Sequence, residues 1–367
     1  MASNTPLRNG YTTGTSASAA AKAGVRYLLT GHIPTEVDTP LPDGNRLVVP
    51  VHAVVPENGA VRVTVIKDGG DDPDVTHGCE IQAVVSLRQG ADIDGLHVRV
   101  SGGKGVGRVT LPGLPVAVGR AAINPAPREQ IAGAALEEAE GLETGRIAVR
   151  VEVPEGERLA RKTMNPRLGI VGGISILGTH GIVRPYSHDS WKASIAEALD
   201  VARAQGLESV VFTTGRRSER FYRELYPQVP ELAMVQAADF FSFSMQAAFE
   251  RGFASVSWAI FFGKLVKHAQ GLEYTHAKTH PVDFTMLAEM CDRAGIARAL
   301  VRQAATANTA RQVLDSISAD PARNALLALL VQKAADAASG FGGNMPVGYT
   351  VFDFDASLLF DGFPSYA

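Results

Sequence analysis

The sequence predicts two folded domains of different class: an α+β domain with a mostly antiparallel sheet over residues 1–160, and a Rossmann-like α/β domain over residues 168–367. Three observations predict this. The 367 residues are enough for about two ordinary domains. The first half alternates β-branched runs with turns rich in Gly, Asp and Pro, which is typical of antiparallel sheets. The second half alternates apolar runs with helical patterns, which is typical of a parallel sheet.

The first half is expected to begin with a helix and to continue mainly as strands. An Ala-rich run follows Gly14 and Thr15, with Thr and Ser available as caps, and Gly31 closes it. A second helix is expected at about 128–140. Alternating or β-branched runs predict strands at 46–55, 60–66, 81–87, 96–101 and 146–153.

The segment 154–169 is expected to be a linker, and the texture of the chain changes beyond it. Apolar runs predict strands at 170–177, 209–214, 232–236, 255–261 and 346–354. Helical patterns separate them at 190–206, 217–225, 239–251, from about 264, and over 282–338. The second domain is therefore expected to be α/β with a helical C-terminal part, and to bind a cofactor.

The composition excludes several classes of protein. With 46% hydrophobic and 20% charged residues, the chain is not disordered, collagenous or a coiled coil. A net charge of -3, from 35 basic and 38 acidic residues, gives no reason to expect nucleic acid or a membrane surface as partner. Cys79 and Cys291 do not make a disulfide framework, which favours a reducing compartment. The polar start shows no signal peptide, and no apolar run approaches the ~20 residues of a membrane span, so a cytoplasmic protein is expected.

A Gly-rich turn at 172–181 follows an expected strand and is the first candidate binding site. Glycines without Cβ atoms let a backbone approach a nucleotide-like ligand closely. The spacing matches neither G-x-G-x-x-G nor a P-loop, so a tight turn without ligand explains it equally well. The candidate residues in this turn are Gly172, Gly173, Ser175, Gly178, Thr179 and Gly181.

A second turn, 213–219, directly follows another expected strand and contains Thr214, Gly215, Arg216 and Arg217. Ligands of open parallel sheets gather at the carboxyl ends of strands. The planar guanidinium groups of arginines there would suit carboxylates. The alternative is a helix-entry turn with solvated arginines.

Two further turns lie in the first half. The segment 67–78 holds Asp71, Asp72 and His77, which could form a metal cage or a general base; its spacing is not that of an EF-hand, and an acidic surface turn is the alternative. The loop 101–108 could cradle an anion or be a flexible hairpin. Together, these turns suggest a small, multi-anionic ligand and no particular reaction.

Read in order, short motifs along the chain resemble one family. The motifs are GYTTGT (10–15), DDPDVTHG (71–78), GVGRVT (105–110), PGL (112–114), AINP (122–125), GISILGT (173–179), GIVRP (181–185) and GKLVK (263–267). The sequence strongly resembles the CbiD family of cobalt-precorrin-5B C(1)-methyltransferases of the anaerobic cobalamin (vitamin B12) pathway. The resemblance is collinear over nearly the whole chain.

The resemblance implies transfer of a methyl group from S-adenosyl-L-methionine to C1 of cobalt-precorrin-5B, which gives cobalt-precorrin-6A. The cobalt would belong to the tetrapyrrole substrate, so no metal site is expected in the protein. Asp71, Asp72 and His77 become candidates for a catalytic base. The 172–181 turn, with Thr214 and Gly215, becomes the candidate cofactor site.

The first domain would contribute to the substrate cleft. The substrate carries acetate and propionate groups, which polar and basic side chains could bind. The candidates for this role are Arg8, Thr13, Thr15, Lys104, Arg108, Arg128, Arg184, Lys264 and Lys267. A non-catalytic tetrapyrrole carrier and a nucleotide-dependent small-molecule enzyme are the alternatives, and a homo-oligomer is compatible with the sequence.

Overall fold

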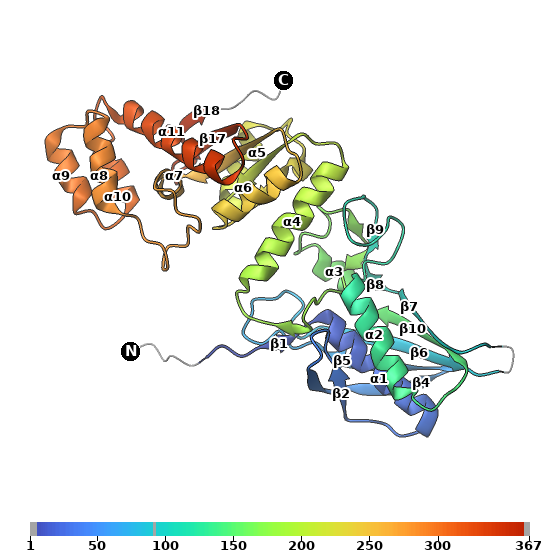
Figure 1. The fold of residues 1–367 in the computed structure, drawn as a ribbon. Coiled ribbons are helices and arrows are strands. Elements are labelled where there is room, and N and C mark those ends of the chain that lie inside the picture. Colours follow the sequence, from blue (N-terminus) through green and yellow to red (C-terminus); the bar gives the residue numbers. More distant parts are fainter. Residues whose placement is uncertain (1–5, 91–92, 363–367) are drawn as a thin grey trace. The chain divides into compact units, whose positions relative to one another are not determined.

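The protein is described here by a computed structural model, which places residues 6–90 and 93–362. These residues form a mixed α/β structure. Its contacts divide the chain into unit 1, Met1–Ser187, and unit 2, His188–Ala367 (Figure 1). Each unit has its own central sheet and is described by itself. No helix in the placed part of the chain combines the length and apolarity needed to cross a membrane.

The central sheet of unit 1 has the strand order β4-β5-β6-β10-β7. Its neighbours pair antiparallel except β10 and β7, which run parallel. The strands are β4 (Ala53–Glu57), β5 (Ala60–Ile66), β6 (Glu80–Arg88), β7 (Leu96–Gly102) and β10 (Gly145–Glu152). Helix α1 (Thr13–Thr30) packs on β5 and β6, and helix α2 (Pro125–Glu138) packs beside α1. The expected strand at 46–55 is instead two strands, because β3 (Arg46–Pro50) pairs with β2 (Glu36–Pro40) and β4 pairs with β5.

Helix α1 is buried along its first thirteen residues. Its Ala, Gly and Ser side chains are small, so the helix lies close to the sheet: a Cβ on Gly24 would come within 2.6 Å of Val85. The Thr12 side chain accepts a hydrogen bond from the Thr15 N–H and caps the start. Gly31, at φ 69°, ends the helix in the left-handed conformation.

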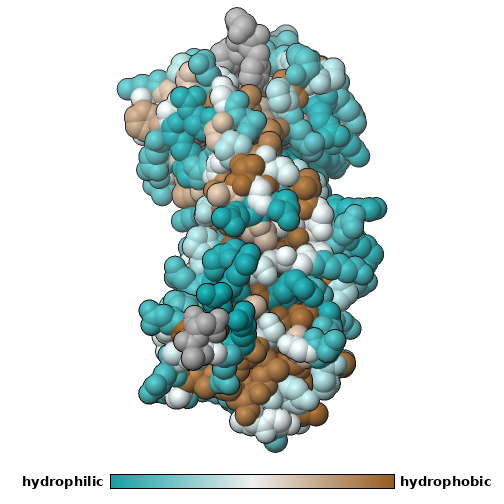
Figure 2. Space-filling model, turned by 90° about the vertical axis from the view of Figure 1, so that its right-hand side faces the viewer, coloured by the Kyte–Doolittle hydropathy of each residue, from teal (hydrophilic) through white to brown (hydrophobic). Residues whose placement is uncertain are grey.

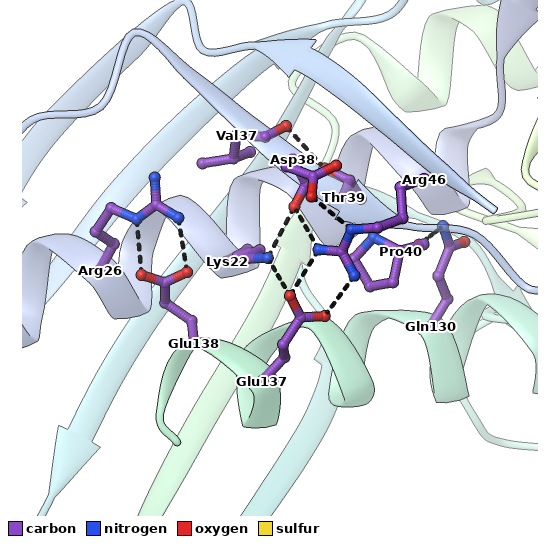
Figure 3. A network of polar contacts seen from close by, with 10 residues as sticks. All are labelled: Lys22, Arg26, Val37, Asp38, Thr39, Pro40, Arg46, Gln130, Glu137 and Glu138. Atoms are coloured by element: carbon purple, nitrogen blue, oxygen red, sulfur yellow. Dashed lines mark hydrogen bonds and ion pairs between the residues drawn. The ribbon is translucent and has the colours of Figure 1, made fainter. Parts of the chain in front are cut away.

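A network of charged side chains joins α1, α2 and the β2–β3 hairpin (Figure 3). Lys22, only 4% exposed, donates to Glu137 Oε1 at 2.6 Å and to the Asp38 carbonyl at 2.8 Å. Arg46 also donates to Glu137, at 2.7 Å. The hydrogen bond from Arg46, with a further contribution from Lys22, lowers the pKa of Glu137 to about 2. The network therefore holds Glu137 as a carboxylate and ties three elements together.

Six two-residue strands tie residues 170–183 to the first half of the chain. Residues 170–171 (β11, Ile170–Val171) pair with β9 (Arg108–Val109), and β12 (Gly173–Ile174) pairs parallel with β8 (Gly105–Val106). At the start of the chain, β1 (Gly10–Tyr11) pairs with β13 (Ile182–Val183). The expected boundary at 160–168 is therefore wrong, since the backbone hydrogen bonds of 170–183 are made within unit 1. The expected linker itself contains a short helix, α3 (Gly156–Ala160).

The sheet of unit 2 has the order β15-β14-β16-β17-β18. The first four strands are parallel and the edge strand β18 is antiparallel. The strands are β14 (Ser209–Thr213), β15 (Met234–Gln236), β16 (Ser255–Phe261), β17 (Val347–Phe352) and β18 (Leu358–Gly362). The helices are α4 (His188–Ala204), α5 (Arg216–Leu225), α6 (Phe241–Glu250), α7 (Phe262–Ala269), α8 (Phe284–Arg293), α9 (Arg298–Ala305), α10 (Ala310–Ser316) and α11 (Arg323–Phe341).

Aromatic residues fill the core between the sheet and α6, α7 and α11. The Phe241 ring stacks on the His268 ring, and the Trp258 ring meets both edge-on.

The face seen in Figure 2 shows hydrophilic and hydrophobic residues side by side. On the face seen in Figure 2, hydrophobic residues gather at the lower end, on unit 1. Exposed apolar side chains of unit 1 include Ile33, Val48 and Val55, each more than half exposed. Val48 and Val55 lie on β3 and β4.

Candidate functional site

The strand order of unit 2 creates a switch point between β14 and β16. The chain leaves β14 through α5 to reach β15 on one side, and leaves β16 through α7 to reach β17 on the other. At such a point the two connections diverge and open a crevice at the carboxyl ends of the strands, where ligands of open α/β sheets bind. The strand order therefore predicts a ligand site of unit 2 at the carboxyl ends of β14 and β16.

A cavity of about 780 Å³ lies at this place. Its walls come from the residues that follow β14, β16 and β17, from helix α10, and from the loop that contains Ala277 and Val282. Thr214 and Gly215, two of the predicted cofactor-binding residues, line it at the start of α5, and Gly263 lines it in the first turn of α7. The volume is in the range of small-molecule sites.

Aromatic rings and arginines form part of the wall. The rings of Phe261 and Phe354 stack with centroids 5.0 Å apart and planes 6° from parallel. The Arg217 guanidinium lies 5.7 Å from the Phe261 ring centroid and 5.4 Å from that of Phe354, and it donates to the Phe354 carbonyl. Arg311 from α10 pairs with Asp353 at 3.2 Å. The wall thus offers flat apolar surface beside fixed positive charge.

The two predicted substrate-binding lysines of α7 line the same cavity, but their ammonium groups bind protein oxygens. Lys264 Nζ pairs with Asp239 and donates to the carbonyl and hydroxyl of Thr275, at 3.1 and 3.0 Å. Lys267 is 6% exposed and donates to the same carbonyl at 2.8 Å. Burial, with the charge of Lys267 nearby, lowers the pKa of Lys264 to about 8. The pair therefore anchors the 275 segment to α7.

Sequence reasoning missed the residues that the cavity draws from elsewhere in the chain. Asp353 and Phe354 follow β17 directly, so their place at the carboxyl end of an expected strand was a usable signal. Arg311 lies on helix α10, and no pattern in the sequence connects this helix with the strands that border the cavity.

The predicted cofactor-binding turn at 172–181 belongs to unit 1, and packing there explains several of its glycines. A Cβ on Gly173 would lie 2.1 Å from the Gly105 carbonyl oxygen. A Cβ on Gly178 would lie 2.2 Å from Thr12 Oγ1. Gly181, at φ 78°, has a left-handed backbone, which glycine adopts without strain. These glycines are thus needed by the fold of unit 1 itself.

The other predicted residues of this turn differ in exposure. Ser175 is buried and donates to Asn165 Oδ1 at 3.2 Å. Gly172 and Thr179 are exposed. The predicted cofactor set is consequently divided, with 172–181 in unit 1 and Thr214 and Gly215 in unit 2.

Thr13 and Thr15 fix the same turn to the start of α1. Thr13 Oγ1 donates to the Leu177 carbonyl at 3.2 Å and accepts from the Leu177 N–H at 2.9 Å. Thr15 Oγ1 donates to the Gly181 carbonyl at 2.8 Å. Both threonines are buried, so their hydroxyls, predicted to bind substrate, already serve the packing of unit 1.

Hydrogen bonds to neighbouring backbone fix the acidic turn of unit 1. Asp71 accepts from the Arg8 N–H at 2.6 Å, and Asp72 Oδ1 accepts from the Tyr186 N–H at 3.0 Å. His77 Nδ1 accepts from the Gly69 N–H at 2.9 Å. The three predicted catalytic residues therefore lie in one turn. One side-chain atom of each accepts a backbone hydrogen bond that fixes the turn.

The hydrogen bond to Nδ1 defines the neutral tautomer of His77. An Nδ1 that accepts from Gly69 carries no proton, so the proton of the neutral ring is on Nε2. The only lone pair of that ring is then already used. For Asp72, Oδ1 accepts from Tyr186 while Oδ2 keeps its capacity to accept.

The remaining predicted basic residues of unit 1 lie at its surface. Arg8 makes a two-pronged contact with Asp68, whose pKa this hydrogen bond lowers. Lys104, Arg108 and Arg184 are exposed. Arg128 is half-buried in the first turn of α2. Among residues 6–90 and 93–362, no three His, Cys, Asp or Glu side chains gather as a metal site.

These features define a mixed α/β protein with a small-molecule cavity at the carboxyl edge of a parallel sheet. Residues 1–185 match the family model CbiD, and residues 274–362 match the model CbiD, C-terminal domain. The chain belongs to the CbiD family. The first match ends within two residues of the boundary between units 1 and 2.

Curated relatives match nearly the whole chain. A cobalt-precorrin-5B C(1)-methyltransferase from Nitratidesulfovibrio vulgaris is 50% identical over 356 residues, covering 95% of this chain and 90% of the relative. One of the same name from Geobacillus sp. is 44% identical over 361 residues, covering 98% and 97%. The crystal structure of a cobalamin biosynthesis protein (cbiD) from Archaeoglobus fulgidus is 29% identical and covers 71% of this chain and 79% of that one, with a TM-score of 0.39.

Proposed function

We propose that this protein transfers a methyl group from S-adenosyl-L-methionine to C1 of cobalt-precorrin-5B, giving cobalt-precorrin-6A in cobalamin biosynthesis. One observation carries the proposal: relatives with this named activity share 50% and 44% identity along nine-tenths or more of both chains. The similarity therefore extends over nearly the whole chain rather than over one part of it.

The cavity of unit 2 supports S-adenosylmethionine as the methyl donor. The molecule has a flat adenine ring, a sulfonium cation and a carboxylate. The faces of Phe261 and Phe354 suit the ring and the cation. Arg216 and Arg217, at the start of α5, suit the carboxylate. The cofactor-binding role proposed for Thr214 and Gly215 is kept, and Gly263 joins it in place of the 172–181 turn, where packing already explains Gly173 and Gly178.

The chain's own contribution to the reaction is mainly positioning. S-adenosylmethionine, when bound, supplies a methyl group that its positive sulfur already activates. The walls around the β14–β16 switch point then hold the donor in one orientation and exclude water, while basic side chains hold the carboxylates of the tetrapyrrole. Alignment of two reactants can supply ~7–11 kcal/mol of the barrier, so no nucleophilic side chain is needed.

We propose Asp72 as the group that accepts the proton lost from the substrate. Its Oδ2 can accept a proton while Oδ1 stays bound to Tyr186, whereas the lone pair of His77 is already engaged. Asp72→Asn keeps the shape and the Tyr186 contact but removes the base, so turnover should fall by ~10² to 10⁴ while affinity for S-adenosylhomocysteine is unchanged. Asp43→Asn, on an exposed turn of unit 1, is the matched control. Turnover near wild type in Asp72→Asn would exclude this role.

The reaction itself is tested with S-adenosylmethionine labelled in its methyl group and authentic cobalt-precorrin-5B under anaerobic conditions. One labelled methyl should appear on the macrocycle at C1, with one S-adenosylhomocysteine released. Label at another carbon would refute the regiochemistry. Pigment binding without any transfer would overturn the enzyme and favour a tetrapyrrole carrier.

A further inference from the structure

We infer that four basic side chains of unit 1, Lys104, Arg108, Arg120 and Arg128, form one binding surface for a polycarboxylate. We call them the basic cluster. The inference rests on the proposed function, because the acetate and propionate groups of the tetrapyrrole would be its ligand. It adds Arg120 to the candidate residues and joins separate candidates into one subsite.

Backbone pairing brings the cluster together from three segments. The Val109 N–H donates to the Arg120 carbonyl at 3.0 Å, and Arg108 pairs across an isolated bridge with Ala121. Lys104 directly precedes β8, and Arg108 begins β9, the next strand along the chain. Arg128 comes from α2 and reaches this end of the sheet, where its Nη1 donates to the Val100 carbonyl at 2.7 Å.

The charges of the cluster are not balanced by the protein. Several other arginines of unit 1 have carboxylate partners: Arg8 pairs with Asp68, Arg26 with Glu138 and Arg62 with Glu152. Among the placed residues, no Asp or Glu forms an ion pair with a member of the cluster. Four cations gathered without an anion favour binding one from solution.

The nearby positive charge affects the pKa of Arg128. Burial lowers its pKa, and the nearby charge of Arg120 lowers it further. The neighbouring carboxylate, Glu129, is exposed and is adjacent on the helix, so it points about 100° away and does not offset Arg120. A bound carboxylate between the two guanidinium groups would turn a repulsion into two attractions.

The start of α2 adds to the same positive region. Its cap, Asn124, makes no side-chain capping bond, and the first turn carries no acidic residue. The first turn of a helix is where negative charge is favoured, yet Arg128 stands there. Pro125 and Pro127 have no N–H to offer, so the side chains and the helix dipole, not backbone donors, would hold an anion.

The arrangement suits several carboxylates on one flat molecule. Three of the four side chains are exposed, so the surface is open to a large ligand. Guanidinium groups bind carboxylates through paired hydrogen bonds, whereas a lysine acts as a point charge. Three arginines and one lysine therefore fit a macrocycle with carboxylates at several corners better than a single small anion.

The test is a fluorescence titration of the full chain with uroporphyrin I, a stable porphyrin that bears acetate and propionate groups. Arg120→Ala and Arg108→Ala should each weaken binding roughly fivefold, as expected for partly exposed charge pairs. Arg128→Lys keeps the charge and should weaken it less than Arg128→Ala. Arg146→Ala removes the same charge at the opposite end of β10 and should change nothing. A porphyrin with cationic side chains should lose no affinity in any of these variants, because each Arg→Ala change removes a repulsion rather than an attraction.

The outcomes separate this inference from the proposed function. If folded Arg120→Ala and Arg108→Ala variants bind uroporphyrin I as wild type does, the cluster is not the subsite, whether or not the enzyme transfers methyl groups. If they lose affinity while the wild type transfers no label to cobalt-precorrin-5B, the subsite stands and the methyltransferase reaction does not. Thermal unfolding of each variant identifies any loss of affinity that follows from misfolding.

Discussion

Substitution of Gly263 tests where the methyl donor binds, because the structure leaves room for a side chain there. Gly263 lies in the first turn of α7 and lines the cavity, with an ordinary helical backbone. A Cβ at this position would meet only Ala310 Cβ, at 3.7 Å, which is normal contact. Gly263→Ala should therefore fold well and gain up to about 1 kcal/mol, since alanine favours the helix over glycine.

A larger side chain at the same place has to enter the cavity. Gly263→Leu should keep or raise the melting temperature, by about 2–4 °C for each kcal/mol gained, yet weaken S-adenosylhomocysteine binding more than tenfold. Calorimetry measures the affinity and differential scanning the stability. Gly340→Leu makes the same change at an exposed helical position of α11 with nothing within 4 Å, and should leave affinity intact. Wild-type affinity in a folded Gly263→Leu protein would remove the donor from this cavity.

Two further predictions concern the stability of unit 1. Gly173→Ala should destabilise the protein by about 1–3 kcal/mol or prevent folding, because its Cβ would overlap the Gly105 backbone; Gly133→Ala, which has open space, should not, and urea unfolding compares them. Glu137 has a pKa lowered from its ordinary 4.5 to about 2, so its carboxylate stabilises the fold above pH 4.5 and loses this contribution as the pH falls toward 2. Acid titration of Glu137→Gln should accordingly show a shallower fall in unfolding free energy between these values than wild type; equal slopes would mean that Glu137 is not held by Lys22 and Arg46.

The elements of unit 2 could be predicted from the sequence because each is defined by local pattern. Apolar runs expected at 209–214 and 255–261 are the strands β14 and β16 to within one residue. Thr214 and Gly215 directly follow the first of these runs, at a strand's carboxyl end that the sequence can show, and they line the cavity there. Local pattern was sufficient for these strands, but it did not reveal the edge strand β18, which follows β17 and pairs with it.

The boundary between the units could not be predicted, because long-range pairing decides it. The apolar, Gly-rich run at 170–177 has the composition of a first strand of a nucleotide-binding domain. Its glycines instead allow contact with 105–107, a relation that nothing within either segment encodes. The same limit explains why 46–55 was expected as one strand: the turn at 51–52 sends its two halves to different sheets.

The pairing of β1 with β13 has a consequence for how the chain is made. Tyr11 and Ile182 are neighbours in the finished unit, and the Gly14 N–H donates to the Leu177 carbonyl. During synthesis, some 170 further residues must be made before these partners of the start of α1 exist. At the usual rate of synthesis this takes roughly ten to thirty seconds. Until then the start of α1 lacks the partners that residues 177–183 provide, although β5, β6 and α2, on which the helix packs, are made earlier. A fragment that stops at residue 160 would lack the pairing of β1 with β13 and the hydrogen bond from Gly14 to Leu177, so this end of unit 1 would stay unpaired.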